Sequence, residues 1–254
     1  MKQSILITGA SGFIGSFLVE EALHRGFETW AGIRASSSRK YLQEPGLHFL
    51  ELDFAHTDRL YEQLKAHREA HGAFDYVVHC AGVTKCIDPA DFDRVNCGQT
   101  CALANALRSL DMTPRQFAFI STLSVFGPVH ENTYEPIRET DTPQPNTAYG
   151  RSKLKAEQAL LAMDGFPCVI YRPTGVYGPR ERDYFLMAES IKHHLDMSVG
   201  YRRQDLTFVY VKDVVQAVFR GIERGVTGRA YFLSDGQVYA SRTFSDLIRR
   251  ELGN

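Results

Sequence analysis

A tyrosine and a lysine four residues apart, Tyr149 and Lys153, form the pair with the clearest chemical potential in this sequence. Residues at positions i and i+4 of a helix lie on one face, so the ammonium group can stand beside the phenol. A cation in that place lowers the pKa of a tyrosine from its free value near ~10. The phenol can then exchange a proton with a substrate hydroxyl or carbonyl group.

A group of hydroxyl side chains follows the apolar run 117–120, which is typical of a buried strand. Ser121, Thr122 and Ser124 come directly after it. Side chains at the carboxyl end of a central parallel strand point into the ligand crevice of an open α/β sheet. One of these hydroxyls is therefore expected to donate a hydrogen bond to the substrate oxygen.

A glycine-rich turn with the spacing GxxGxxG lies between the first apolar run and the first helical pattern. Gly9 allows a tight turn, Gly12 lets the backbone approach a pyrophosphate, and Gly15 lets helix and strand pack closely. The free N–H groups and partial positive charge of the helix N-terminus then face the phosphates. In this strand-turn-helix setting the motif predicts a dinucleotide site, in which hydride transfer to or from a nicotinamide accompanies the proton transfer. The expected contacts are Gly9, Ser11, Gly12, Phe13, Ile14 and Gly15, with Lys153 holding the nicotinamide ribose and Tyr149 beside it.

The end of the second strand, 28–33, selects between the two nicotinamide cofactors. An acid there would bind the adenosine ribose 2′-hydroxyl and repel a 2′-phosphate, but the segment 34–40 contains three serines and three basic residues and no acid. Arg34 can pair with a phosphate. We therefore expect NADP, with NAD left open, and we expect Asp53, just after the third strand, to reach the adenine amino group.

The elements that must position these residues alternate along the chain. Strands are expected at 4–7, 28–33, 48–52, 75–79, 116–120 and 168–171, and helices at 13–25, 57–70, 91–110 and 148–163. Such alternation predicts right-handed crossovers and a parallel sheet covered on both faces. The expected fold class is α/β, a Rossmann-type doubly wound parallel sheet with a small C-terminal substrate lobe.

The pattern loosens after residue 172. Helices are expected at 183–194, 212–224 and 244–252, and extended segments at 208–211 and 231–233. We interpret 1–172 as an NAD(P)-binding Rossmann domain and 173–254 as a smaller substrate-binding lobe, short or truncated, interleaved with the first and packed on the carboxyl edge of the sheet.

Composition excludes several classes of function. The 29 basic and 30 acidic residues leave a net charge of −1, without the basic excess that nucleic acids or membrane surfaces require. No run approaches the ~20 apolar residues of a membrane span, and the apolar stretch near the N-terminus is too short for the core of a signal peptide. The five cysteines form no CxxC pair and are expected to be free thiols, which fits a reducing cytoplasm; no metal site is expected.

Taken together, the chain resembles the extended short-chain dehydrogenase/reductase family, often labelled NAD-dependent epimerase/dehydratase. The resemblance is carried by TGASGFIG at 8–15, HCAG at 79–82, VNCGQT at 95–100, STLSVFG at 121–127, YGRSK at 149–153, RPTGVYGP at 172–179 and FVYVKDVVQAV at 208–218. It implies a catalytic trio of Thr122, Tyr149 and Lys153, because Gly127 puts Thr122 at the family's hydroxyl position.

The resemblance also implies further contacts. Phe54, Ala81, Gly82 and Pro173 would contact the cofactor, the last together with the backbone of 174–176 at the nicotinamide, and Asn96 would brace an active-site water and helix. Family members often dimerise through the helices that correspond to 91–110 and 148–163, so we expect a homodimer.

Two departures from the family pattern bear on the reaction. Leu123 and Ser124 stand where sugar-nucleotide dehydratases carry an Asp-Glu pair, which disfavours dehydration. Gly175 stands where epimerases often have an asparagine that contacts the diphosphate, although Arg180, Arg182, Arg202 or Arg203 could bind a diphosphate instead.

The sequence therefore favours an NADP-dependent carbonyl reductase or dehydrogenase that acts on a small molecule. A nucleotide-sugar epimerase is the main alternative, and the small-molecule substrate is accordingly a carbonyl compound or a nucleotide sugar. A non-catalytic dinucleotide sensor is a third reading, which the intact Thr122, Tyr149 and Lys153 disfavour.

Overall fold

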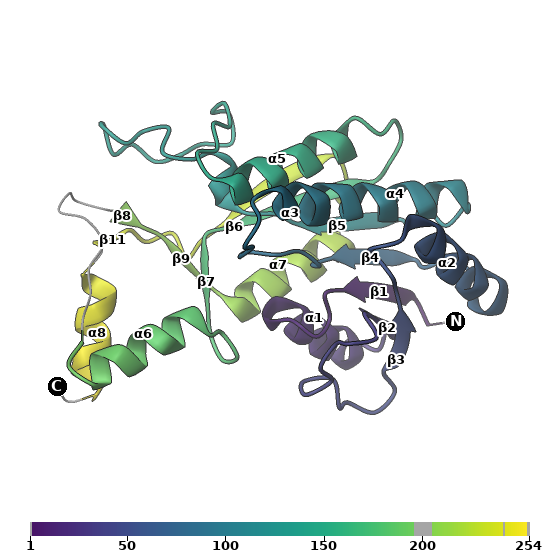
Figure 1. Ribbon diagram of the computed structural model, residues 1–254, viewed down its shortest axis with the longest axis horizontal. Helices are drawn as coiled ribbons and strands as arrows, with labels where there is room; N and C mark the ends of the chain where they lie inside the picture. Colours follow the sequence, from purple (N-terminus) through teal and green to yellow (C-terminus); the bar gives the residue numbers. More distant parts are fainter. Residues whose placement is uncertain (1, 196–204, 241, 253–254) are drawn as a thin grey trace.

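The structure, a computed structural model, describes residues 2–195, 205–240 and 242–252 (Figure 1). Its centre is a sheet of seven parallel strands in the order β10-β6-β5-β4-β1-β2-β3. The strands are β1 (Ser4–Thr8), β2 (Glu28–Ile33), β3 (His48–Glu51), β4 (Tyr76–His79), β5 (Gln116–Ile120), β6 (Cys168–Pro173) and β10 (Arg229–Leu233). Strand order runs outward in both directions from the β1/β4 pair, which places a ligand crevice at their carboxyl ends. The predicted doubly wound α/β fold is confirmed.

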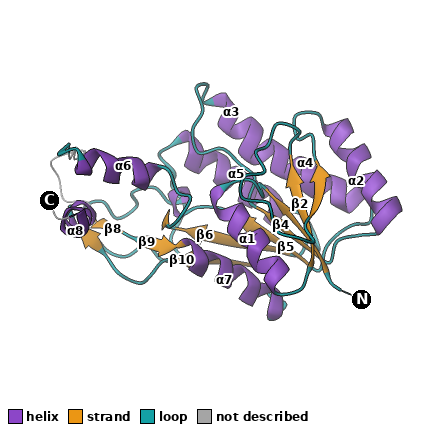
Figure 2. Cartoon of the chain, turned by 90° about the horizontal axis from the view of Figure 1, so that it is seen from below, coloured by secondary structure: helices purple, strands orange, loops and turns teal. Residues whose placement is uncertain are grey.

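Helices cover both faces of the sheet (Figures 1 and 2). One layer contains α1 (Phe13–His24) and α7 (Val211–Glu223), and the other contains α2 (Thr57–His71), α4 (Thr100–Ser109) and α5 (Ala148–Leu161). Successive side chains of a strand enter opposite layers, so Ile5 and Ile7 pack in one core cluster and Leu6 in the other. The central strands β4, β5 and β6 are thus buried on both sides.

The long helix expected at 91–110 is interrupted. It begins as α3 (Ala90–Phe92), widens into the π-helical segment η1 (Asp93–Gln99) and continues as α4. The prediction of one uniform α-helix was therefore wrong at its first turns. The wide turns hold Asn96 fully buried, with its amide bound to groups of other elements, as is frequent for π-helical segments at functional sites.

Residues after 172 contribute to two parts of the molecule. Helix α7 and strand β10 belong to the layers of the main sheet, next to α1 and β6. The remainder forms two small ladders and a helix pair that lie beyond the carboxyl edge (Figure 1). These elements are β7 (Gly175–Tyr177) with β9 (Phe208–Tyr210), β8 (Asp205–Leu206) with β11 (Tyr239–Ala240), and α6 (Asp183–Lys192) with α8 (Thr243–Leu252). The two parts alternate along the chain, and their assignment as separate domains stays a prediction.

Candidate active site

The glycine-rich turn has the geometry that its spacing predicts. Gly9 has a φ of +67°, and a Cβ atom there would lie 2.7 Å from the backbone nitrogen of Ala81. A Cβ atom on Gly15 would collide with the carbonyl group of Gly9. Helix α1 begins at Phe13, and no side chain in the described part of the chain caps it. The turn thus brings β1, the loop after β4 and an uncapped helix N-terminus together, a cradle that fits a pyrophosphate.

The loop after β2 places Arg34 at the surface, at the carboxyl end of the strand. Its backbone nitrogen donates to the Ser37 hydroxyl at 3.0 Å. The other two cations of this loop lie on aromatic rings, Arg39 over Phe49 at 4.3 Å and Lys40 over Tyr41 at 5.1 Å. Of the three predicted cations, the Arg34 guanidinium is therefore the one without an ion pair or ring contact among the described residues.

The carboxylate of Asp53 is already engaged by neighbouring groups. It lies 2.9 Å from Nδ1 of His56 and 3.5 Å from Arg59, and it accepts from the backbone nitrogen of Ala55. The His56 hydrogen bond is the main cause that lowers the pKa of this carboxyl group. Its expected contact with adenine stays a prediction, as does that of Phe54, whose ring lies 6.1 Å from the imidazole of His79.

Tyr149 stands at the start of α5, which Thr147 caps by accepting a hydrogen bond from the backbone nitrogen of Gly150 at 3.0 Å. Burial raises the pKa of Tyr149 to about 12, and a hydrogen bond with Thr122 opposes the rise. The hydroxyl of Thr122 also lies 3.2 Å from that of Ser124. The structure therefore brings the predicted proton donor and the predicted hydroxyl donor together at the carboxyl end of β5.

The ammonium group of Lys153 is buried between α5 and β5. It donates to the carbonyl oxygen of Ile120 at 2.7 Å and lies 4.1 Å from the centre of the Phe119 ring. Burial lowers the pKa of Lys153 to about 8. The sequence predicted that this cation lowers the pKa of Tyr149, whereas in the chain alone the pKa is raised, because burial of the phenol dominates and the ammonium group faces the strand end.

Asn96 braces the loop after β4 against α5. Its side-chain amide donates to the carbonyl oxygen of Val83 and to the Ser152 hydroxyl, both at 3.0 Å, and its oxygen accepts from the Val83 nitrogen at 2.8 Å. Ser152 in turn donates to the carbonyl oxygen of Tyr149 at 2.8 Å. The same amide oxygen lies 2.8 Å from the place of a Cβ atom on Gly82, so the predicted cofactor loop is packed directly on this brace.

Sequence reasoning did not single out His79, the last residue of β4. Its Nδ1 lies 2.7 Å from the Thr8 hydroxyl and its Nε2 lies 2.9 Å from the Thr100 hydroxyl, which itself donates to the carbonyl oxygen of Asn96. Burial lowers the pKa of His79 to about 3, so the ring is neutral and links the glycine-rich turn to η1. The HCAG motif contained this histidine, but its role depends on hydroxyls distant in sequence.

The segment after Pro173 shows why glycine stands at position 175, where aromatic side chains lie close to the backbone. Pro173 is the last residue of β6 and is buried at the carboxyl edge, where its contact with a nicotinamide stays a prediction. A Cβ atom on Gly175 would lie 2.6 Å from the hydroxyl of Tyr184 and 3.0 Å from the ring of Phe208. A side chain at the position where epimerases often carry asparagine would therefore require Tyr184 or Phe208 to shift.

Of the arginines considered for a diphosphate, Arg180 is committed elsewhere. Its guanidinium donates to the Ser16 hydroxyl at 2.9 Å and to Glu20 at 2.5 Å, and it lies between the rings of Phe17 and Tyr41. Arg182 is exposed at the start of α6, and Arg202 and Arg203 lie outside the described residues.

The described part of the chain contains neither a cluster of metal ligands nor a membrane-spanning helix. No cluster of three or more His, Cys, Asp or Glu side chains there could hold a metal ion. None of the helices there combines the length and the apolar character needed to cross a membrane.

Comparison with known proteins agrees with this geometry. The sequence model of the NAD dependent epimerase/dehydratase family matches residues 5–234. GDP-6-deoxy-D-mannose reductase of Pseudomonas aeruginosa is 28% identical over 98% of this chain and 80% of the relative, and UDP-glucose 4-epimerase of Vibrio cholerae is 28% identical over 93% and 72%. The solved structure of the Bordetella bronchiseptica enzyme WbmH in complex with NAD⁺ superimposes with a TM-score of 0.81, at 27% identity over 100% of this chain and 82% of that one.

Proposed function

Because the chain belongs to the NAD-dependent epimerase/dehydratase family, whose members it resembles over nearly its whole length, we propose that it is an NADPH-dependent reductase of a small carbonyl compound. Thr122, Tyr149 and Lys153 carry the reaction in this proposal. The observation that supports it most directly is the loop after β2, where Arg34 is exposed and no acid stands in the place that would bind an unphosphorylated ribose.

The cofactor, when bound, supplies the hydride. The turn from Gly9 to Gly15 holds its pyrophosphate, and Lys153 holds its nicotinamide ribose. Thr122 donates a hydrogen bond to the substrate carbonyl oxygen, and Tyr149 gives its proton to the oxygen as negative charge develops there. Burial raises the pKa of the phenol, so it keeps its proton at neutral pH and can act as the donor.

The crowding at Gly175 also favours reduction. A diphosphate-binding asparagine there would require Tyr184 or Phe208 to shift, and Arg180 is paired with Glu20. A nucleotide sugar would therefore need a different set of contacts in this chain from the one that epimerases often use. The name of the relative GDP-6-deoxy-D-mannose reductase supports reduction and brings nucleotide-linked sugars into the range of substrates to be tested.

A nucleotide-sugar epimerase is the second candidate, favoured by the family match and by the relative named UDP-glucose 4-epimerase. An epimerase oxidises and re-reduces one substrate, so retention of its nicotinamide through the cycle is useful to it. A reductase releases oxidised cofactor in each turnover.

That difference sets the experiment. The purified protein is examined by mass spectrometry for retained nucleotide and is then assayed with aldehydes, ketones and nucleotide sugars. We expect little retained NAD and stoichiometric NADPH consumption with a carbonyl substrate. Stoichiometrically bound NAD, with interconversion of a nucleotide sugar and no net change in cofactor, would replace the reductase by the epimerase.

We further propose a homodimer that assembles through α4 and α5, in the cytoplasm. Both helices lie side by side on the outer face of one layer, where Leu161 at the end of α5 is 53% exposed (Figure 1). Light scattering after gel filtration tests the assembly, and a monomer at micromolar concentration would contradict it.

A further inference from the structure

A buried ion pair lies one helical turn beyond the catalytic lysine. Glu157 of α5 and Arg172 of β6 are joined by three hydrogen bonds of 2.6, 3.1 and 3.2 Å. The Glu157 side chain is 1% exposed and that of Arg172 is 9% exposed. The guanidinium group also lies over the ring of Phe126 at 5.1 Å and near that of Phe232 at 5.9 Å. Both charges are therefore removed from water.

The carboxylate of Glu157 has a third partner, which connects it to the site. The Ser121 hydroxyl donates to its Oε1 atom at 2.5 Å, and the backbone nitrogen of Ser121 donates to the carbonyl oxygen of Tyr171 at 2.7 Å. Ser121 is the residue before Thr122, and Arg172 is the residue after Tyr171. The ion pair thus fixes the ends of β5 and β6 relative to α5.

Side chains of helix α5 form hydrogen bonds with three consecutive residues at and after the end of β5. Lys153 binds the carbonyl oxygen of Ile120, Glu157 binds the hydroxyl of Ser121, and Tyr149 hydrogen-bonds with Thr122. Positions 149, 153 and 157 are spaced by four residues and so share one helix face. Rotation or sliding of α5 at Glu157 would therefore change the distance between the two groups that meet the substrate oxygen.

Stability alone gives a weak reason for such a pair. Burying two charges costs several kcal/mol per ion, and apolar residues of similar volume often replace a buried pair without loss. Burial lowers the pKa of Lys153, and negative charge on Cys80 and, to a smaller extent, on Glu157 opposes that lowering. Apolar residues in place of the ion pair would remove the part due to Glu157.

We propose that Glu157 is a positioning residue of the active site, which, held by Arg172, sets the place of Thr122 through Ser121. Its carboxylate also shares a helix face with Lys153, one turn away, where negative charge favours the charged ammonium group. The proposal rests on the proposed function, since it assigns Glu157 a role in the chemistry of Thr122, Tyr149 and Lys153.

Three variants separate the effect of the Ser121 hydrogen bond from the effect of the Glu157 charge. Ser121→Ala removes the hydrogen bond and leaves the ion pair intact. Glu157→Gln keeps an oxygen that can accept from Ser121 and removes the charge. The double variant Glu157→Leu/Arg172→Met removes both charges and leaves neither buried alone, so it is expected to fold even where Glu157→Gln does not.

The first readout needs no substrate. The titration of Lys153 is followed by NMR of protein labelled with ¹³C at lysine Cε, and its signal is assigned by its absence from Lys153→Met. We expect the midpoint to move to lower pH in Glu157→Gln and in the double variant, and to stay in place in Ser121→Ala. An unchanged midpoint in both charge variants would overturn the electrostatic part of the proposal, and a double variant that does not fold would reduce the pair to a structural role.

The second readout is turnover of NADPH with the carbonyl compound that the substrate panel identifies. A misplacement of about 1 Å costs up to about 100-fold in rate, so we expect kcat to fall about 10- to 100-fold in Ser121→Ala and in the double variant, which lose the Ser121 hydrogen bond. The fall should be smaller in Glu157→Gln, which keeps the acceptor, and the dissociation constant of NADPH should change less than threefold in all three variants. Wild-type kcat in Ser121→Ala would overturn the positioning role. If the wild-type protein oxidises NADPH with no compound of the panel, the proposed function fails, while the Lys153 titration still decides on Glu157.

Discussion

Two buried histidines mark two regions of the molecule that differ in how their polar groups are satisfied. His79, at the candidate site, is 1% exposed, and both of its ring nitrogens meet threonine hydroxyls. His67, on α2, is 5% exposed, and its Nδ1 has no hydrogen-bond partner among the described residues. Burial lowers the pKa of both imidazoles, to about 3 for His79 and about 4 for His67.

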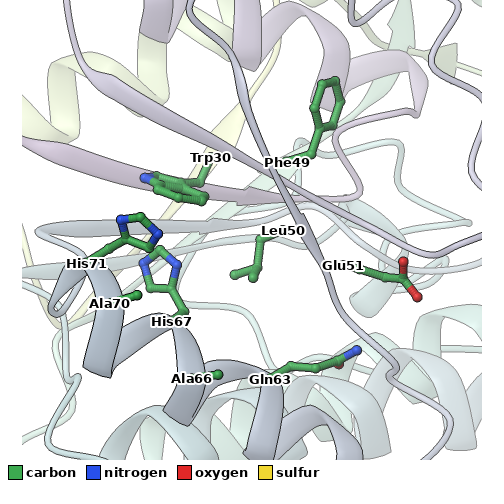
Figure 3. A pocket seen from close by; sticks show the side chains of 9 residues that line it. All are labelled: Trp30, Phe49, Leu50, Glu51, Gln63, Ala66, His67, Ala70 and His71. Carbon is green, nitrogen blue, oxygen red and sulfur yellow. The ribbon is translucent and has the colours of Figure 1, made fainter.

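The region around His67 also borders a hollow. A cavity of about 520 Å³ lies there beside the edge strand β3, separated from β5 by three strands. Figure 3 shows Trp30, His67 and His71 gathered at one end of it. The contacts of His67 are ring contacts: the Trp30 ring lies edge to face with the imidazole, with 4.5 Å between centroids, and the imidazole stacks on the Phe74 ring at 4.2 Å.

The difference teaches that the two regions hold their buried polar groups in different ways. In the candidate site the buried hydroxyl, amide, carboxylate and ammonium groups described above are all hydrogen-bonded, many across elements distant in sequence. Such networks fix one arrangement of the side chains, whereas ring packing around an unsatisfied nitrogen fixes none. Four predictions test this contrast, in order of decreasing expected effect.

The largest effect is expected at Tyr149. Tyr149→Phe removes the proton donor and should lower turnover about 10²-fold or more while cofactor binding is retained, the usual scale for a general acid. The matched control is Tyr171→Phe, which removes a buried hydroxyl that has no partner in the described part of the chain and should leave turnover unchanged. Steady-state kinetics with NADPH check both. Wild-type-like turnover in Tyr149→Phe would remove this residue from the mechanism.

A smaller effect is expected at His79. His79→Phe leaves the hydroxyls of Thr8 and Thr100 each without one partner in a buried place, which should cost about 2 kcal/mol of unfolding free energy at pH 7. Urea denaturation followed by circular dichroism measures it. A cost no larger than that of His67→Phe would show that the two regions do not differ in the way described.

The next effect concerns the cofactor. Arg34→Ala removes the cation expected to meet the 2′-phosphate and should weaken NADPH about tenfold, since one charge-assisted hydrogen bond contributes about 1.5 to 3 kcal/mol, and leave NADH unchanged. Arg39→Ala is the control, because that guanidinium lies on the Phe49 ring. Both affinities are read from nicotinamide fluorescence. Equal affinities of the wild-type protein for the two cofactors would contradict the NADP proposal.

Motifs of short range were predictable from the sequence, and contacts of long range were not. The turn at Gly9 and the helix start at Tyr149 depend on neighbours in the chain, so spacing alone predicts them. The brace of Asn96 needs a π-helical widening and a loop 13 residues earlier, and the ion pair of Glu157 needs a strand end 15 residues later. The ion pair of Glu157 had one signal in the sequence, a glutamate one turn after Lys153 on the face of α5 that is expected to be buried. Strand β10 belongs to the main sheet because it pairs with β6. A short apolar run in the sequence does not show which strand it will pair with.

The smallest effect is expected at His67 and depends on pH. The unfolded chain binds a proton on this histidine near pH ~6.5, whereas the folded chain binds it only near pH 4, because burial and the neighbouring His71 disfavour the charge. Between these values the unfolded state holds more protons, so the free energy of unfolding falls as the pH falls from 6.5 to 4. His67→Phe removes this contribution and leaves a ring that can stack on Phe74. At pH 7 the variant should match the wild-type protein within about 0.5 kcal/mol, the range of substitutions that break no buried bond. At pH 5 it should be the more stable of the two, as urea denaturation at both pH values would measure. A destabilised variant at pH 7 would mean that the Nδ1 atom has a partner in solution, and the contrast with His79 would then be one of degree.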